Sequence, residues 1–115
     1  MIIKHGDQKT TVNENMRGGN GKVVLKQLIS QPEMYEKGRL FSRILLQPGC
    51  SIGFHVHENE MEAYYVVKGK ALYDDNGTKV ELEAGDGTYT PCGGGHAVEN
   101  NGSEDLELIA LILFK

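Results

Sequence analysis

The sequence predicts an all-β fold in the form of a small β-barrel. Short runs rich in β-branched and aromatic residues recur along the 115 residues and are separated by turn-forming residues. No segment keeps a helical periodicity for longer than two turns. Fifteen glycines against three prolines suit a chain that makes many tight turns.

Each predicted strand is bounded by turn signals. Residues 31–38 are expected to form a turn or a single helical turn, and Gln47-Pro48-Gly49 ends the strand that follows. Asn76-Gly77 tolerates the positive φ of a type I′ turn and therefore predicts a hairpin. The predicted strands cover residues 22–29, 40–46, a stretch carrying His55 and His57, 62–67, 70–73, 78–82, 88–90, a stretch carrying His96, and 106–114.

Composition and charge narrow the classes of function. The chain shows no break in composition, which predicts one domain over 1–115, with N-terminal strands and a loop over 1–38 and a barrel core over 39–115. A formal charge of −4 and a pI near 5.5 argue against a nucleic-acid partner. No run approaches the roughly 20 apolar residues of a membrane span. The N-terminus lacks a signal-peptide apolar region, so we expect a cytoplasmic protein with Cys50 and Cys92 as free thiols.

Three of the four histidines, together with one glutamate, indicate a metal site. His55 and His57 are two residues apart, so on a strand their imidazoles project from the same face. If the strand over 62–67 folds back beside them, Glu62 reaches the pair, and His96 arrives from across the barrel. Imidazole and carboxylate groups bind divalent transition metals, of which Mn, Fe, Ni and Zn are the candidates.

Around these residues the chain resembles the cupin superfamily, and in particular its small single-domain bacterial members. The first motif of that family is matched by Gly49, His55, His57, Glu62 and Gly69. The second is matched by Gly85, Pro91, Gly93, His96 and Asn100. The resemblance implies a double-stranded β-helix, or jelly roll, that holds a metal through the three histidines and the glutamate. It also implies a structural role for Asn100 at a turn.

Three further residues are candidates for catalysis. Tyr64 shares the face of Glu62, where it could donate a hydrogen bond to a metal-bound ligand or serve only as a core tyrosine. Arg43 would clamp a carboxylate if its face of the strand turned inward, although charged residues on strands usually face solvent. Glu60 could act as a general acid or base at the pocket mouth, but with Glu58 it is expected to cap a turn in solvent.

Other features concern the walls of the pocket and the assembly. Ile52 and Phe54 are expected to line the core or the pocket. The glycine-rich stretch 17–21 lacks the lysine-serine ending of a phosphate loop and is predicted to be a loop or a lid. The resemblance also implies a homodimer, because small cupins commonly pair through sheet edges and swapped N-terminal strands, which hides exposed edges.

The residues fit more than one class of function. Four protein ligands leave up to two positions open on an octahedral metal, where a small carboxylate- or oxygen-bearing substrate could chelate. The resemblance then implies a metal-dependent enzyme of the dioxygenase or decarboxylase type. A non-catalytic, metal-dependent module that binds a small molecule needs the same ligands and the same pocket. A sugar isomerase or epimerase is a third alternative, and the intact ligand set counts against it.

Overall fold

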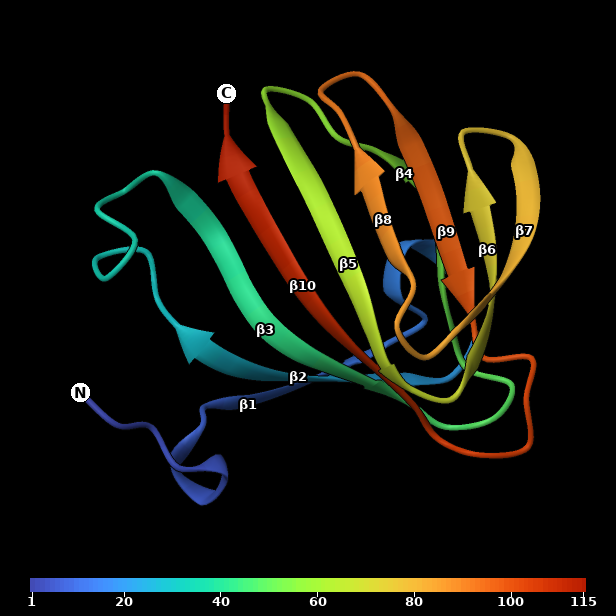
Figure 1. Ribbon diagram of the computed structural model, residues 1–115, viewed down its shortest axis with the longest axis horizontal. Coiled ribbons are helices and arrows are strands. Elements are labelled where there is room, and N and C mark those ends of the chain that lie inside the picture. The colour runs from blue at the N-terminus through green and yellow to red at the C-terminus, as the bar shows by residue number, and fades with distance from the viewer.

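The strands form two antiparallel sheets that face each other, as Figure 1 shows. In the computed structural model, which describes residues 1–115, the strands are β1 (Thr10–Glu14), β2 (Lys22–Ile29), β3 (Gly38–Leu46), β4 (Ser51–Val56), β5 (Glu60–Lys68), β6 (Lys70–Asp75), β7 (Thr78–Glu83), β8 (Gly87–Thr90), β9 (Gly95–Glu99) and β10 (Leu106–Phe114). One sheet has the order β1-β2-β3-β10-β5-β8 and the other β4-β9-β6-β7. From β3 onwards the chain crosses repeatedly between the sheets, which makes the fold a double-stranded β-helix.

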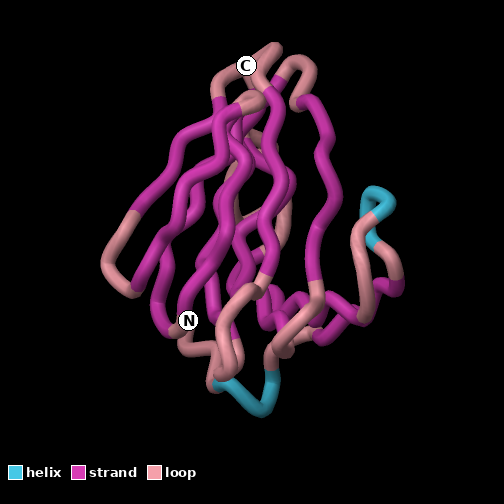
Figure 2. The backbone as a smooth tube through the Cα atoms, turned by 90° about the vertical axis from the view of Figure 1, so that its right-hand side faces the viewer, coloured by secondary structure: helices cyan, strands magenta, loops and turns pink.

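Most of the predicted elements are confirmed. Strands β2 and β10 begin and end at the predicted residues, and both residues of the Asn76-Gly77 turn have positive φ, 51° and 103°, as a type I′ turn requires. Strand β1 is not predicted by the sequence, because four of its five residues are exposed and its polar side chains show no alternation. The two short helices, η1 (His5–Asp7) and η2 (Met16–Gly18), lie at the margin of the strands (Figure 2). Neither has the length or the apolar composition needed to cross a membrane.

The core lies between the two sheets and is continuous with the predicted metal ligands. Twelve buried apolar residues form it, among them Val66 of β5 and Leu108 of β10, which pair across the ladder. Side chains two apart on a strand share a face, so the inward row of β5 runs from Glu62 through Tyr64 to Val66. One strand therefore carries both a polar site residue and part of the apolar core.

A β-bulge in β4 decides which of its side chains face inward. Ile52 pairs with Val98 of β9 and His55 pairs with His96, so two residues of β4 between these pairs lie opposite a single residue of β9. Ile52 and His55 consequently face the same side, and Ile52 is buried as predicted. Phe54 projects outward and is half-exposed, so the prediction that it lines the core or the pocket is wrong.

Asn100 joins the end of β3 to the loop that precedes β10. Its side chain is buried, and Nδ2 donates to the carbonyl oxygens of Leu46 and Glu104, both at 2.8 Å. Oδ1 accepts the backbone N–H of Gly102 at 3.0 Å. All the hydrogen-bonding groups of this amide serve the two loops, which agrees with the structural role expected for the residue.

We expect the Asn100→Ala substitution to lower the free energy of unfolding by about 2–4 kcal/mol, because two carbonyls near the core lose their donor. Urea unfolding followed by circular dichroism measures the change. Asn101→Ala is the matched control, since Asn101 is exposed and makes only a 3.4 Å surface contact with Glu81. Equal midpoints for the two variants would contradict the role given to Asn100.

Candidate metal centre

The four predicted ligands come together between the two sheets. His55 lies on β4 and pairs directly with His96 of β9, while His57 follows the end of β4. Glu62 lies on β5, which belongs to the opposite sheet. The predicted arrangement is therefore wrong, because Glu62 reaches the histidines from the facing sheet and His96 is the strand neighbour. The turn after His57 reverses the chain and also carries it from one sheet to the other. The pattern of side chains along a sequence does not show such a change of sheet.

The donor atoms of this group are closely spaced. One ligand atom from each of the four residues lies within 4.8 Å of all the others. Glu62 Oε1 is 2.9 Å from Nε2 of both His57 and His96, and these two nitrogens are 3.0 Å apart. His57, Glu62 and His96 are buried, whereas His55 is partly exposed. The group thus presents three imidazoles and one carboxylate to a single point with one accessible side.

Every histidine ring is oriented by a hydrogen bond at its other nitrogen. Such bonds fix the tautomer and turn Nε2 towards a metal. The Nδ1 contacts are His57 with Glu60 Oε2 at 2.6 Å, His96 with the Tyr73 hydroxyl at 2.7 Å, and His55 with the Gly53 carbonyl at 2.8 Å.

The spacing of the ring nitrogens also fits an ion. Two neutral imidazoles with Nε2 lone pairs facing each other repel, and a cation bound between His57 and His96 would remove this repulsion. Ligand atoms at right angles around a metal, each at about 2.1 Å, lie about 3.0 Å apart. We conclude that the donor set and its spacing suit a divalent metal.

Two of the ligands have pKa values displaced in opposite directions. Burial lowers the pKa of His55, which favours the neutral imidazole that a metal requires. The hydrogen bond to Glu62 raises the pKa of His57, so a proton on His57 competes with a metal for the same nitrogen.

Glu60 does not lie in solvent, contrary to the prediction. Glu58 is exposed, but the Glu60 side chain is only 12 % exposed and receives two hydrogen bonds from Arg39, both at 2.7 Å. Arg39, followed by His57, lowers the pKa of Glu60 to about 2. Glu60 therefore stays ionised and holds His57 in position. Its partner Arg39 lies on another strand, β3, so the sequence around Glu60 contains no signal for the pair.

Tyr64 lies beside the metal ligands. Its ring stacks on His96 with centroids 5.0 Å apart and an interplanar angle of 21°. Burial, with a smaller contribution from the Glu62 carboxylate, raises the pKa of Tyr64 well above its ordinary value. Its hydroxyl group therefore keeps its proton and can act as a donor.

Arg43 is not brought to the site. It lies on the outer face of β3, where it pairs with Glu107 at 3.2 Å and donates to Gln8. Tyr73 and Thr90, which both contact Nδ1 of His96, were not predicted as site residues. Their inward strand positions are also those of ordinary core residues, so the sequence carries no separate signal for them.

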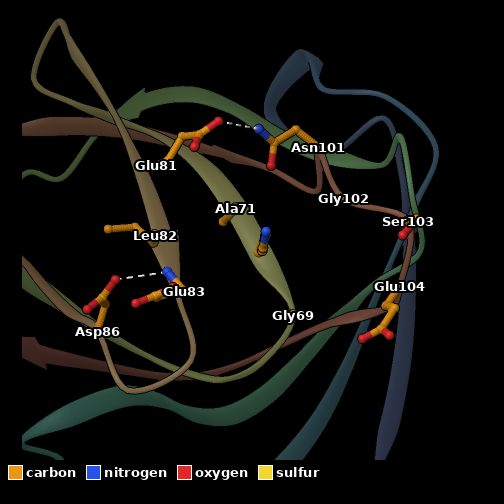
Figure 3. A pocket seen from close by; sticks show the side chains of 11 residues that line it. Gly69, Ala71, Glu81, Leu82, Glu83, Asp86, Asn101, Gly102, Ser103 and Glu104 are labelled. Atoms are coloured by element: carbon orange, nitrogen blue, oxygen red, sulfur yellow. Dashed lines mark hydrogen bonds between the residues drawn. The ribbon is translucent and has the colours of Figure 1, made fainter.

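A cavity of about 280 Å³ opens over the ligands His55, His57 and Glu62. Its walls are mixed, with the apolar side chains of Ile44 and Ile52 beside polar and charged ones. A larger hollow of about 760 Å³ lies elsewhere, between the β6–β7 hairpin and residues 101–104. Figure 3 shows the acidic side chains around that second hollow, and none of the four predicted ligands lines it. The 280 Å³ cavity is therefore the space available to a ligand of the metal group.

Fold and site together define a small double-stranded β-helix protein with a three-histidine, one-glutamate group that could hold a metal ion. The chain belongs to the cupin family, since residues 42–112 match the cupin domain.

The chain is similar to several proteins whose descriptions mention oxalate. An oxalate-binding protein of Thermotoga maritima is 42% identical over 113 residues, which cover 98% of this chain and 93% of that protein. A crystal structure described as a predicted oxalate decarboxylase, also from Thermotoga maritima, superposes over the full length of both chains with a TM-score of 0.96 and 41% identity. An oxalate decarboxylase of Bacillus subtilis is 35% identical over 77 residues, which cover 63% of this chain and 20% of that protein.

We expect Glu60→Gln to weaken the binding of a divalent metal by about 10–100-fold, because the hydrogen bond that orients His57 loses its charge. Competition with a chelating dye measures the affinity. Glu58→Gln is the matched control, since it removes the same charge from an exposed neighbour. An affinity for Glu60→Gln equal to that of Glu58→Gln would show that Glu60 does not support the site.

Proposed function

We propose that the protein binds a divalent transition metal through His55, His57, Glu62 and His96 and uses it to capture oxalate or a similar small carboxylate. The observation that carries this proposal is the convergence of three oriented Nε2 atoms and one carboxylate below a cavity. Mn, Fe, Ni and Zn all accept such ligands. Four protein ligands leave room for a chelating anion on an octahedral ion.

The walls of the cavity favour binding over catalysis. Apart from Glu62, no carboxylic acid lines the cavity, and Glu60 is held ionised behind His57 by Arg39. The Tyr64 hydroxyl keeps its proton and can donate to a bound carboxylate, but it is a poor base. A decarboxylase is the second candidate, supported by the similarity to the Bacillus subtilis enzyme. A dioxygenase would need only open metal positions, and nothing further in the site favours it.

We expect about one oxalate per chain to bind to the Mn-loaded protein. We expect no oxalate to bind to protein whose metal has been removed with a chelator. Isothermal titration calorimetry measures both states. Glu62→Gln should abolish oxalate binding, because it removes a carboxylate ligand while nearly keeping the shape of the side chain. His5→Ala removes an exposed histidine outside the site and should leave oxalate binding unchanged. Equal oxalate binding with and without metal would contradict the proposal, and formate released from oxalate would establish the decarboxylase instead.

We infer that the protein also forms a homodimer, through the outer face of the six-stranded sheet. A sheet face in contact with water normally carries polar residues, but this face is almost entirely apolar on β3, β10, β5 and β8. The face carries one ion pair, between Arg43 and Glu107, in which the two charges cancel. Its apolar side chains are Phe41, Met61, Ala63, Tyr65, Tyr89, Ile109, Leu111 and Leu113.

The size of this face suits a second copy of the chain. Strands β3, β10 and β5 have nine residues each, about 30 Å, and β8 has four, so at about 4.8 Å between strands the face measures roughly 500 Å². A stable interface buries about 800 Å² on each partner, so the face together with its rim is sufficient. Tyr65 and Tyr89, which are 51% and 62% exposed, are the largest side chains that a partner would cover.

We expect the wild-type protein to have a mass of about 25 kDa in solution, twice the 12.7 kDa of the chain, and the Tyr65→Lys/Tyr89→Lys variant to be monomeric. Light scattering coupled to gel filtration measures the mass. Val80→Lys is the control, since Val80 is 45% exposed on the other sheet. A wild-type mass of one chain, or a dimer that survives the double substitution, would rule out this interface.

A further inference from the structure

The glycine-rich stretch 17–21 belongs to a strap, residues 15–21, that is fastened to β4. The N–H of Ser51 donates to the Asn20 carbonyl at 2.8 Å, and the Asn20 N–H donates to the Ser51 hydroxyl at 2.9 Å. The strap also lies so close to β4 that a Cβ atom on Gly53 would collide with the carbonyl oxygen of Arg17. These contacts hold the strap in place, so it is a fixed wall of the cavity over the metal group and not a loose loop.

Arg17 is the only charged residue of the strap. It adopts a left-handed conformation, with φ of 55° and ψ of 30°, as does Asn15 of the same strap, and non-glycine residues rarely do so. Strained residues of this kind persist where the surrounding structure imposes them, and they are common at ligand clamps. Arg17 lines the cavity and forms no ion pair within the chain, whereas the other arginine of the cavity, Arg39, is neutralised by Glu60. Its positive charge is therefore available to a ligand.

The cavity carries further polar groups on β1 and at Lys9, which immediately precedes it. Lys9, Thr11 and Asn13 are spaced two apart, as residues that share one face of a strand are, and all three line the cavity. Lys9, like Arg17, has no carboxylate partner. Two cations and two neutral hydrogen-bonding side chains thus form a polar wall of the cavity.

The β1 part of this polar wall lies apart from the metal group, whereas Arg17 lies against Gly53, two residues before His55. Glu62 is on β5 and the polar row is on β1, with β10, β3 and β2 between them in the sheet. At about 4.8 Å per strand the separation along the curved sheet is about 19 Å, and the curvature shortens the direct path across the cavity. A water molecule takes up about 30 Å³ in the liquid. Oxalate is only a few times larger than water, so it would leave much of the 280 Å³ cavity unfilled.

We propose that the cavity receives a dicarboxylate longer than oxalate, with one end on the metal group and the second carboxylate held by Arg17, assisted by the positive charge of Lys9. The proposal rests on the proposed metal-dependent capture of a carboxylate and adds the recognition of the distal end. Arginine and lysine both bind carboxylates through charge-assisted hydrogen bonds. The ligand class is therefore a short dicarboxylic acid that carries a chelating group, such as a 2-hydroxy acid, at one end.

Malate and lactate test this assignment, because they share the 2-hydroxy carboxylate end and only malate has a second carboxylate. Calorimetry on the Mn-loaded protein should show malate binding at least about tenfold more tightly than lactate. Arg17→Gln and Lys9→Gln should each weaken malate binding several-fold and leave lactate and metal binding unchanged. Lys79→Gln is the control, since it removes an exposed cation from β7, outside the cavity.

The outcomes separate this inference from the function on which it rests. Oxalate binding combined with equal affinities for malate and lactate would overturn the distal site alone. A malate preference that persists in the Arg17→Gln/Lys9→Gln double variant would also overturn it, because other groups would then hold the second carboxylate. Failure of the metal-loaded protein to bind oxalate, malate or lactate would overturn both proposals.

Discussion

The site depends on the hydrogen bonds that orient its three imidazole rings. Each ring is fixed at Nδ1 by a protein group, whether the carboxylate of Glu60, the hydroxyl of Tyr73 or the backbone of Gly53. The Nε2 atoms of the three rings therefore cannot turn away from one another. The hydrogen bonds at Nδ1 keep His57 close to His96, although two neutral rings gain nothing from this contact. Rigid strands on both sides of the centre preserve this arrangement, which is how a small barrel can keep a preorganised ligand set.

The sheets contribute unequally to the centre. The smaller sheet provides the paired histidines of β4 and β9, and the larger sheet provides Glu62 together with Arg39, which holds Glu60. The larger sheet also forms the concave wall of the cavity, from the metal group on β5 to the polar row on β1. One sheet therefore supplies most of the metal ligands, while the other shapes the space in which a ligand would be recognised.

Much of the fold could be read from the sequence, because turn chemistry and strand composition are local properties. The Asn76-Gly77 hairpin and the limits of β2 and β10 follow from such signals. The four residues of the His/Glu group that could hold a metal could be named as well, since their spacing is recorded along the chain. Sheet membership could not, and this is why the positions of Glu62 and His96 were exchanged. The bulge that turns Phe54 outward and the pairing of Arg39 with Glu60 depend on contacts between distant strands, which a single sequence does not specify.

The separation of these four residues along the chain has a consequence for when a metal could bind. His55 and His96 are neighbours across a ladder although 41 positions separate them (96 − 55), and Glu62 must come from the facing sheet. Contacts of such long range form slowly, because a large loop has to close first. The full ligand set therefore exists only late in folding, and an unfolded chain offers at most the local His55–His57 pair. Raw affinity follows much the same order among metals at any such site, so the metal that is available also decides which one is bound. We therefore expect the group to retain the ion that is abundant where folding finishes.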